Sequence, residues 1–287
     1  MITIIHHSAD FDGHASGHSV RHILGKKTDE VNMIGWDYKD EITFLDDLIE
    51  KNDKFDKIYI TDISFPPAYM IRLKEIGAVW IDHHITAIKD SEANGYADMA
   101  GLREDGTAAC RLVWQFFAEK PPESILLLGL YDVFDKSTRD WESDTVPFQY
   151  GLRGIANPSW TYILEYSTED IENVKVLGRG IIQYQRLMNE EEANKCFDLT
   201  IDGFKLIAKN ANSGSAHFDW MTEEETKGYD GMMRFQYAPD KNIFSCSCYG
   251  WEHSPDLSGI AKKYGGGGHA RACGFTTTLK ELTGLLK

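Results

Sequence analysis

The chain has 287 residues, of which 42% are hydrophobic, 26% charged and 12% aromatic, a balance typical of a folded globular protein rather than a disordered one. This length suits two domains, each large enough to bury its own core. The formal net charge of −15 argues against a protein that coats long nucleic acid through an extended basic surface.

The sequence shows no sign of a membrane span or a secretion signal. No apolar run approaches the length of a membrane span, and the N-terminus MITIIHHSADFD has neither the basic start nor the cleavage site of a signal peptide. We therefore expect a cytoplasmic protein that does not enter the membrane. Its five cysteines are odd in number and lack metal-finger spacing, which predicts reduced and mostly packed thiols.

Residues 1 to about 135 alternate short apolar runs with longer helical patterns. The candidate strands are ITIIH, VNMIGW, KIYITDI and AVWIDHH. The helical patterns are the stretch His14–Lys26, EITFLDDLIEKN, PPAYMIRLKEIG and, after the last strand, GTAACRLVWQFFAEK. Strands that alternate with helices in this way are typical of a doubly wound parallel sheet.

The second half of the chain has a different pattern. A long helix is predicted over roughly 171–195, although Gly178 and Gly180 reduce the helix propensity of its middle. Strand-like runs FKLIAKNA, GMMRFQYA and NIFSCSCYG then accompany a helix at LSGIAKKYG. We therefore predict an α/β protein with an N-terminal parallel-sheet domain over 1–160, a helical linker over 161–195 and a smaller mixed α/β domain over 196–287. Two such domains would create a cleft.

Three of the N-terminal candidate strands end in side chains that can bind metals. The first gives His6, His7, Asp10 and Asp12, the third gives Asp62, and the fourth gives Asp82, His83 and His84. Because ligands bind at the carboxyl ends of strands in open parallel sheets, these residues are expected to converge. Carboxylate and imidazole suit Mn²⁺, Mg²⁺ or a similar ion, and no thiolate falls at these strand ends.

Asp62 is the natural candidate for a carboxylate that bridges two ions, because it stands alone at the end of its strand. Two divalent cations roughly 3.5 to 4 Å apart could clamp a phosphoryl group and activate water for in-line attack. Each residue taken alone also has a structural explanation; Asp10, for example, could cap the helix that begins near Gly13. The convergence of several such residues favours a metal centre.

A glycine-rich motif, GGGGHARACGF, occupies residues 265–275. Its glycines allow close approach of the backbone to a ligand and present N–H groups to phosphate oxygens. A flexible hinge would explain the glycines but not the residues that follow them, His269 and Arg271. A histidine and an arginine guanidinium can both donate hydrogen bonds to a phosphate. The candidate substrate-binding residues are Gly266, Gly267, Gly268, His269 and Arg271.

Together these motifs resemble those of the DHH phosphoesterase superfamily, in a member that carries the DHH-associated C-terminal domain. HHSADFDG resembles the first family motif, with a His four residues before the first of two alternating Asp. ITDIS resembles the second motif, IDHH is the signature, and GGGGHARACGF matches the GGGH motif of the associated domain. The resemblance spans nearly the whole chain. Many relatives carry an Arg in the serine-containing strand before the glycine motif, where this sequence has Cys248 and Tyr249.

The resemblance implies two divalent cations, with Mn²⁺ favoured over Mg²⁺ or Co²⁺. It implies that one ion is held by His6, Asp10 and Asp62, and the other by Asp12, Asp62, His83 and a fourth-motif Asp. His84 would face the substrate phosphate, and Asp62 and His84 would be the catalytic residues. The choice of His6 over its neighbour His7 depends on its spacing to Asp10.

The fourth motif has two candidates. LLGLYDVFDK offers Asp132 and Asp135, and we predict Asp132 because it directly follows the apolar, strand-like run ILLLGLY.

The expected function is that of a nanoRNase-like phosphodiesterase that hydrolyses short oligonucleotides to mononucleotides, because an acidic chain of this length has little room for additional nucleic-acid-binding modules. The alternatives are a phosphatase on pAp-like nucleotides, polyphosphate or pyrophosphate, and a non-catalytic nucleotide-binding relative. The intact ligand set argues against the last, because clustered buried carboxylates without metal are electrostatically costly. The sequence leaves the oligomeric state open.

Overall fold

The computed structural model describes residues 1–25, 30–51, 56–211, 218 and 221–286. The chain divides into two compact units, Met1–Ile181 and Ile182–Lys287. The division falls inside the long helix α9 (Thr168–Glu191) and within the range 161–195 that was predicted as a linker. The predicted helix ends at Lys26 and Asn52 lie outside the described residues.

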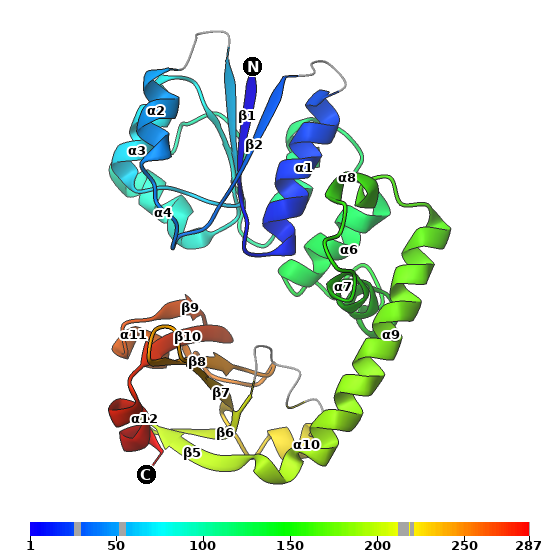
Figure 1. The fold of residues 1–287 in the computed structure, drawn as a ribbon, viewed down its shortest axis with the longest axis vertical. Helices are drawn as coiled ribbons and strands as arrows, with labels where there is room; N and C mark the ends of the chain where they lie inside the picture. The colour runs from blue at the N-terminus through cyan, green and yellow to red at the C-terminus, as the bar shows by residue number, and fades with distance from the viewer. Residues whose placement is uncertain (26–29, 52–55, 212–217, 219–220, 287) are drawn as a thin grey trace. The chain divides into compact units, whose positions relative to one another are not determined.

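The N-terminal unit contains a four-stranded parallel sheet in the order β2-β1-β3-β4. Its strands are β1 (Ile2–His7), β2 (Val31–Trp36), β3 (Lys57–Thr61) and β4 (Val79–Ile81). The connecting helices are α1 (Phe11–Gly25), α2 (Phe44–Glu50), α3 (Pro67–Glu75) and α4 (Ile85–Asn94). In Figure 1, α2, α3 and α4 lie on one side of this sheet and α1 on the other. The predicted doubly wound parallel sheet is confirmed.

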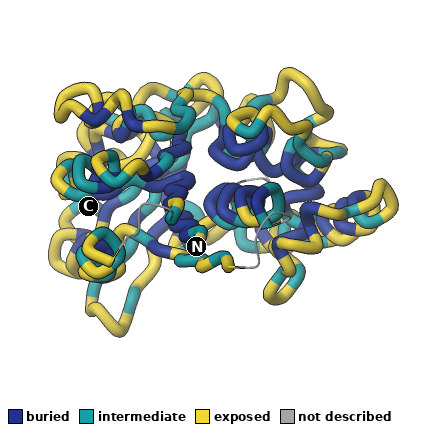
Figure 2. The backbone as a smooth tube through the Cα atoms, turned by 90° about the horizontal axis from the view of Figure 1, so that it is seen from above, coloured by how far each residue is buried: buried dark blue, intermediate teal, exposed yellow. Residues whose placement is uncertain are grey.

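Burial on both faces explains why β1, β3 and β4 are mostly apolar. Ile5, Ile60 and Trp80 belong to the cluster that packs under α2 and α3. Ile4 and Ile81 face the opposite way and pack with Val20 of α1 and Leu112. Figure 2 shows the buried stretches in dark blue and the exposed turns in yellow.

A group of helices follows β4 and completes the N-terminal unit. They are α5 (Ala109–Phe116), α6 (Glu123–Asp132), the π-helix η1 (Trp141–Thr145), α7 (Val146–Arg153), α8 (Trp160–Ile163) and α9. The run ILLLGLY, predicted as strand-like, is helical and forms most of α6. Ile125, Leu127, Leu128 and Leu130 are all buried, so α6 is apolar around much of its circumference, and such a run cannot be distinguished from a buried strand by periodicity alone.

Gly178 of α9 and Gly151 of α7 have a packing role at the contact between the two helices. A Cβ added at Gly178 would lie 1.8 Å from the backbone oxygen of Pro147 in α7. A Cβ added at Gly151 of α7 would lie 2.0 Å from the backbone oxygen of Val174. The two helices therefore approach so closely at these positions that only glycine fits.

The C-terminal unit contains a six-stranded sheet in the order β5-β6-β7-β8-β10-β9. Its elements are η2 (Ala193–Lys195), β5 (Phe197–Ile201), β6 (Phe204–Asn210), α10 (Glu223–Thr226), β7 (Gly231–Ala238), β8 (Ile243–Tyr249), α11 (Ser258–Lys263), β9 (Gly267–His269), β10 (Ala272–Thr277) and α12 (Leu279–Leu285). The pair β6 and β7 is parallel and the other pairs are antiparallel. The predicted mixed α/β architecture is confirmed.

The cysteines behave as the sequence predicts. All five lie within the described residues and are free thiols, and four of them are buried. Cys246 and Cys248 share one face of β8 and pack with Cys273 of β10 in the core of the C-terminal unit. Among the described residues, no helix has both the length and the apolar composition needed to cross a membrane.

Candidate metal centre

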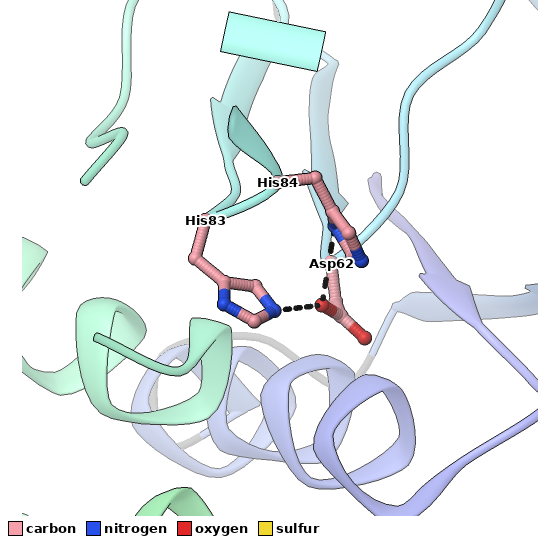
Figure 3. Close-up of side chains that lie close together, drawn as sticks. All are labelled: Asp62, His83 and His84. Atoms are coloured by element: carbon pink, nitrogen blue, oxygen red, sulfur yellow. Dashed lines mark ion pairs between the residues drawn. The ribbon is translucent and has the colours of Figure 1, made fainter. Parts of the chain in front are cut away.

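The carboxyl ends of β1, β3 and β4 bring histidines and aspartates together in the N-terminal unit. His6 pairs with Thr61, and Thr61 pairs with Ile81, so the three strands end at the same edge of the sheet. The next residue after β3 is Asp62, and His83 and His84 follow β4 closely. Figure 3 shows both imidazoles pointing toward the Asp62 carboxylate.

One group of potential ligands consists of His7, Asp10 and Asp62, with one donor atom from each within 4.8 Å of the others. The Nδ1 atom of His7 lies 3.2 Å from Oδ2 of Asp10 and 3.5 Å from Oδ2 of Asp62. The other Asp10 oxygen accepts a hydrogen bond from the Gly13 amide at 2.9 Å. Asp10 therefore both caps the start of α1 and turns an oxygen toward this group.

A second group consists of Asp12, His83 and Asp132. The Nε2 atom of His83 lies 3.7 Å from Oδ2 of Asp12 and 3.5 Å from Oδ2 of Asp132. It also lies 3.3 Å from Oδ1 of Asp62. Asp62 therefore presents one carboxylate oxygen toward each of the two groups.

The hydrogen bonding of Asp62 is that expected of a metal ligand. Its side chain is 1% exposed, and neither carboxylate oxygen accepts a hydrogen bond from the described residues. Burial, reinforced by the charge of Asp12, raises its pKa well above the ordinary value. Its φ of 59° places a non-glycine residue in the left-handed region, where backbone strain of about 1–3 kcal/mol is often found at functional sites. A divalent cation would satisfy these oxygens and offset the repulsion between the carboxylates.

The ionised form of Asp132 is also unfavourable unless a positive charge lies nearby. Burial and the charges of Asp12 and Asp62 raise its pKa well above the ordinary value. The donors around it are carboxylates and an imidazole, the set that Mn²⁺ and Mg²⁺ accept. The residues present therefore fit a pair of divalent cations.

Two further contacts fix the orientation of these side chains. The fully buried Asp82 accepts hydrogen bonds from the backbone amides of His83 and His84, and its Oδ1 lies 2.7 Å from Nδ1 of His84. The carboxylate of Asp12 accepts hydrogen bonds from the amides at the start of α5, at 2.8 and 2.9 Å. Asp82 thus positions the histidines rather than joining either group.

The structure places His7, and not the predicted ligand His6, beside Asp10 and Asp62. Successive side chains of a strand point to opposite faces, so His6 shares the face of Ile4 and turns toward α1. A Cβ added at Gly17 of α1 would lie 2.7 Å from Cβ of His6. Burial lowers the pKa of His6 to about 4, as expected for a neutral packed histidine.

The structure also separates the two fourth-motif candidates. Asp132 is the last residue of α6 and lies with Asp12 and His83. Asp135 instead accepts hydrogen bonds from the amide and hydroxyl of Ser137 at 2.8 and 2.6 Å, and lies 3.7 Å from Arg111. Asp132 is therefore the candidate ligand, although it ends a helix and not a strand.

The glycine motif forms a hairpin of β9 and β10 in the C-terminal unit. Gly268 has a φ of 125°, and a Cβ there would lie 2.6 Å from the backbone oxygen of Ala272. Residues 266–269 and Arg271 are exposed. Within the part of the chain that the structure describes, the side chains of His269 and Arg271 make no ion pair or hydrogen bond. They are therefore available to a ligand.

Arg234, which belongs to none of the sequence motifs, lies on the same sheet as the glycine motif. Arg234 pairs with Ser247, Ser247 with Gly274, and Gly274 with Gly267, so the four form one lateral row across β7, β8, β10 and β9. The Arg234 side chain is buried, donates to the Ser247 hydroxyl at 2.9 Å, and leaves Nε without an acceptor among the described residues. In the sequence, Arg234 is the single charged residue of the strand-like run GMMRFQYA, and this isolated charge is the feature that could have identified it.

Comparison with known proteins gives a structural match without a sequence match. No protein-family model matches the chain, and a search of curated proteins found no match. A pGpG-specific phosphodiesterase, PggH from Vibrio cholerae, matches with a TM-score of 0.53 and 13% sequence identity, over 98% of this chain and 95% of that one. An exopolyphosphatase-related protein from Bacteroides fragilis matches with a TM-score of 0.50 and 16% identity, over 99% and 89% of the two chains.

These matches cover both units of the chain. At such low sequence identity they show the fold. The chain shares the fold of these two proteins, which agrees with the two-domain α/β architecture predicted from its sequence.

Proposed function

We propose that this chain is a hydrolase of phosphate esters that uses two divalent cations. The observation that carries the proposal is Asp62, a buried carboxylate without hydrogen bonds among the described residues that turns one oxygen toward each of two His/Asp groups. A bridging carboxylate is what a two-metal site requires. Its fold, shared with a phosphodiesterase, is consistent with this chemistry.

The two groups define which residues would hold the cations. His7, Asp10 and Asp62 would hold one, and Asp12, Asp62, His83 and Asp132 the other. When bound, such cations neutralise charge on a phosphoryl group and make a water molecule a stronger nucleophile at neutral pH. Mn²⁺ is the favoured ion, with Mg²⁺ and Co²⁺ as alternatives, because the donors are oxygens and imidazole nitrogens.

His84 is the proposed contact to the substrate phosphate. Burial lowers its pKa, but the bond to Asp82 and the charges of Asp82 and Asp62 outweigh burial, so the pKa lies above its ordinary value. With Nδ1 held by Asp82 at 2.7 Å, a protonated ring would leave Nε2–H free to donate to a phosphate oxygen. His84 would then stabilise negative charge that develops during hydrolysis.

The proposed substrate is a short oligonucleotide, cleaved to mononucleotides as in the nanoRNase-like branch. The net charge of −15 opposes a long polyanion, whose affinity depends on many cationic contacts. A dinucleotide needs few such contacts. PggH, which shares the fold, is described as specific for the dinucleotide pGpG.

In the C-terminal unit, the proposed substrate-binding residues are Gly266, Gly267, Gly268, His269 and Arg271, together with Arg234. The exposed glycines allow a ligand to approach the backbone closely, and cations without an ion-pair partner among the described residues are suited to phosphate oxygens. The Arg234 guanidinium of β7 would take the role of the Arg that many relatives carry on the serine-containing strand, which is β8 in this chain.

A substrate panel with purified full-length chain tests the proposal. We expect mononucleotide release from di- to pentanucleotides with Mn²⁺, none with EDTA, and none from Asp62→Asn. Asp135→Asn is the matched control, since Asp135 is bonded outside both groups, and it should retain activity. Phosphate release from pAp, polyphosphate or pyrophosphate without cleavage of oligonucleotides would replace the nuclease assignment with a phosphatase. Failure to bind any cation would favour a non-catalytic protein.

A further inference from the structure

Three aromatic rings whose residues lie close in sequence to Asp132 pack against one another as a stack. The rings of Tyr131 and Trp141 lie 5.5 Å apart at 5°, and the ring of Phe134 lies 6.2 Å from the first at 29° and 5.8 Å from the second at 28°. Tyr131 directly precedes Asp132, and Phe134 follows it by two residues. We refer to these three residues as the aromatic stack.

Phe134 combines exposure with backbone strain. Its side chain is 65% exposed, and its φ is 54°. It follows the end of α6, where Asp135 donates its amide to the backbone oxygen of Leu130 at 2.9 Å. Glycine is the usual residue at such a left-handed helix end, and a bulky side chain there costs about 1–2 kcal/mol. Neither the exposure nor the strain of Phe134 contributes to stability, and strained backbone positions often lie at functional sites.

Positive charges lie close to the aromatic stack. The ammonium of Lys136 lies 5.5 Å from the centre of the Trp141 ring, and the guanidinium of Arg153 lies 5.4 Å from the Tyr131 ring. These contacts orient two cations in a chain whose net charge is −15. A ligand on the stack would therefore meet both an aromatic surface and positive charge, the combination that binds nucleotides without reading their sequence.

We propose that the aromatic stack, through the exposed ring of Phe134, binds a nucleobase of the substrate. The proposal rests on the function proposed above, because it assumes that the substrate phosphate lies at the centre to which Asp132 belongs. Two residues of chain place the Cα atoms of Asp132 and Phe134 at most about 7 Å apart, so the two side chains start from neighbouring points of the chain. The aromatic stack would thus favour substrates with a base over inorganic polyphosphate or pyrophosphate.

Replacement of Phe134 by glycine tests this role. Since stacking of a base is typically worth a factor of about 5 to 100 in affinity, Phe134→Gly should raise KM for a 5′-phosphorylated dinucleotide by that factor. Hydrolysis of the same dinucleotide with abasic sugars should not change. Relief of the backbone strain and loss of the ring contacts with Tyr131 and Trp141 act on stability in opposite directions, so circular dichroism should confirm that the variant is folded at the assay temperature. Phe134→Trp should restore the KM, and Tyr184→Ala, which removes a ring 67% exposed on α9, should have no effect.

An equal change in KM for the dinucleotide and its abasic analogue would overturn the proposal, as would an unchanged KM for both. A binding measurement separates this outcome from failure of the proposed hydrolysis. Saturation-transfer NMR on AMP in EDTA should show contact of the base protons with wild type and Phe134→Trp, and a reduced signal with Phe134→Gly. Equal signals from wild type and Phe134→Gly would overturn the role of the stack even if the chain hydrolyses nothing.

Discussion

Replacement of Asp62 by asparagine should remove the stabilisation that divalent cations give this fold. Asn keeps the shape of the side chain but removes the charge that both His/Asp groups share. A cation present at 100 times its dissociation constant stabilises the folded state by about 2.7 kcal/mol per site. For a domain of 150–250 residues, each kcal/mol raises the unfolding temperature by about 2–4 °C. We therefore expect Mn²⁺ to raise the unfolding temperature of wild type by about 5–10 °C per site.

The assay is thermal unfolding of wild type, Asp62→Asn and Asp135→Asn, each in EDTA and in excess Mn²⁺. Wild type and Asp135→Asn should gain stability with Mn²⁺, and Asp62→Asn should gain almost none. In EDTA, Asp62→Asn should unfold at or above the temperature of wild type, because it removes a carboxylate that lies buried near Asp12. The reasoning would be refuted by an Asp62→Asn variant that gains as much stability from Mn²⁺ as wild type does.

Three further predictions separate roles within the structure. His7→Gln should weaken Mn²⁺ binding at one site, while His6→Gln should leave Mn²⁺ stoichiometry unchanged; calorimetric titration that gave the reverse order would restore His6 as the ligand. Gly178→Ala should destabilise the fold by about 1–3 kcal/mol, because its Cβ would meet the backbone of α7. Gly180→Ala should stabilise the fold by about 0.5–1 kcal/mol, because no described atom lies within 4 Å of a Cβ at that position. Urea unfolding of the two variants compares these free energies. Arg271→Ala should raise KM about tenfold or more and leave the metal content near that of wild type, and loss of metal from this variant would contradict a role in substrate binding.

The parallel sheet could be predicted because strands that are buried on both faces appear in the sequence as short, nearly continuous apolar runs. Runs such as ITIIH and KIYITDI are mostly apolar, and candidate metal ligands cluster where each strand ends. The same rule located Asp62 and His83 at one edge of the sheet before any distance was known. The helical run ILLLGLY was misassigned because a helix buried on most sides lacks the periodicity that distinguishes a helix from a strand.

Other parts of the candidate site depend on packing that the sequence does not record. The choice between His6 and His7 is set by which face of β1 meets α1, and the closeness of Gly17 to His6 decides it. The sequence does not show that Arg234 of β7 and the glycines of β9 belong to one row across the sheet. That relation depends on the strand order, in which β8 and β10 lie between β7 and β9. The position of Phe134 in the left-handed region follows from how α6 ends.

The central claim is tested most directly by incubation of the purified chain with a 5′-phosphorylated dinucleotide in Mn²⁺ or EDTA, with mononucleotide measured by chromatography. Wild type should release mononucleotide only with Mn²⁺, and Asp62→Asn should release none under either condition. Release by wild type in EDTA, or equal release by wild type and Asp62→Asn in Mn²⁺, would contradict hydrolysis at a two-cation centre bridged by Asp62.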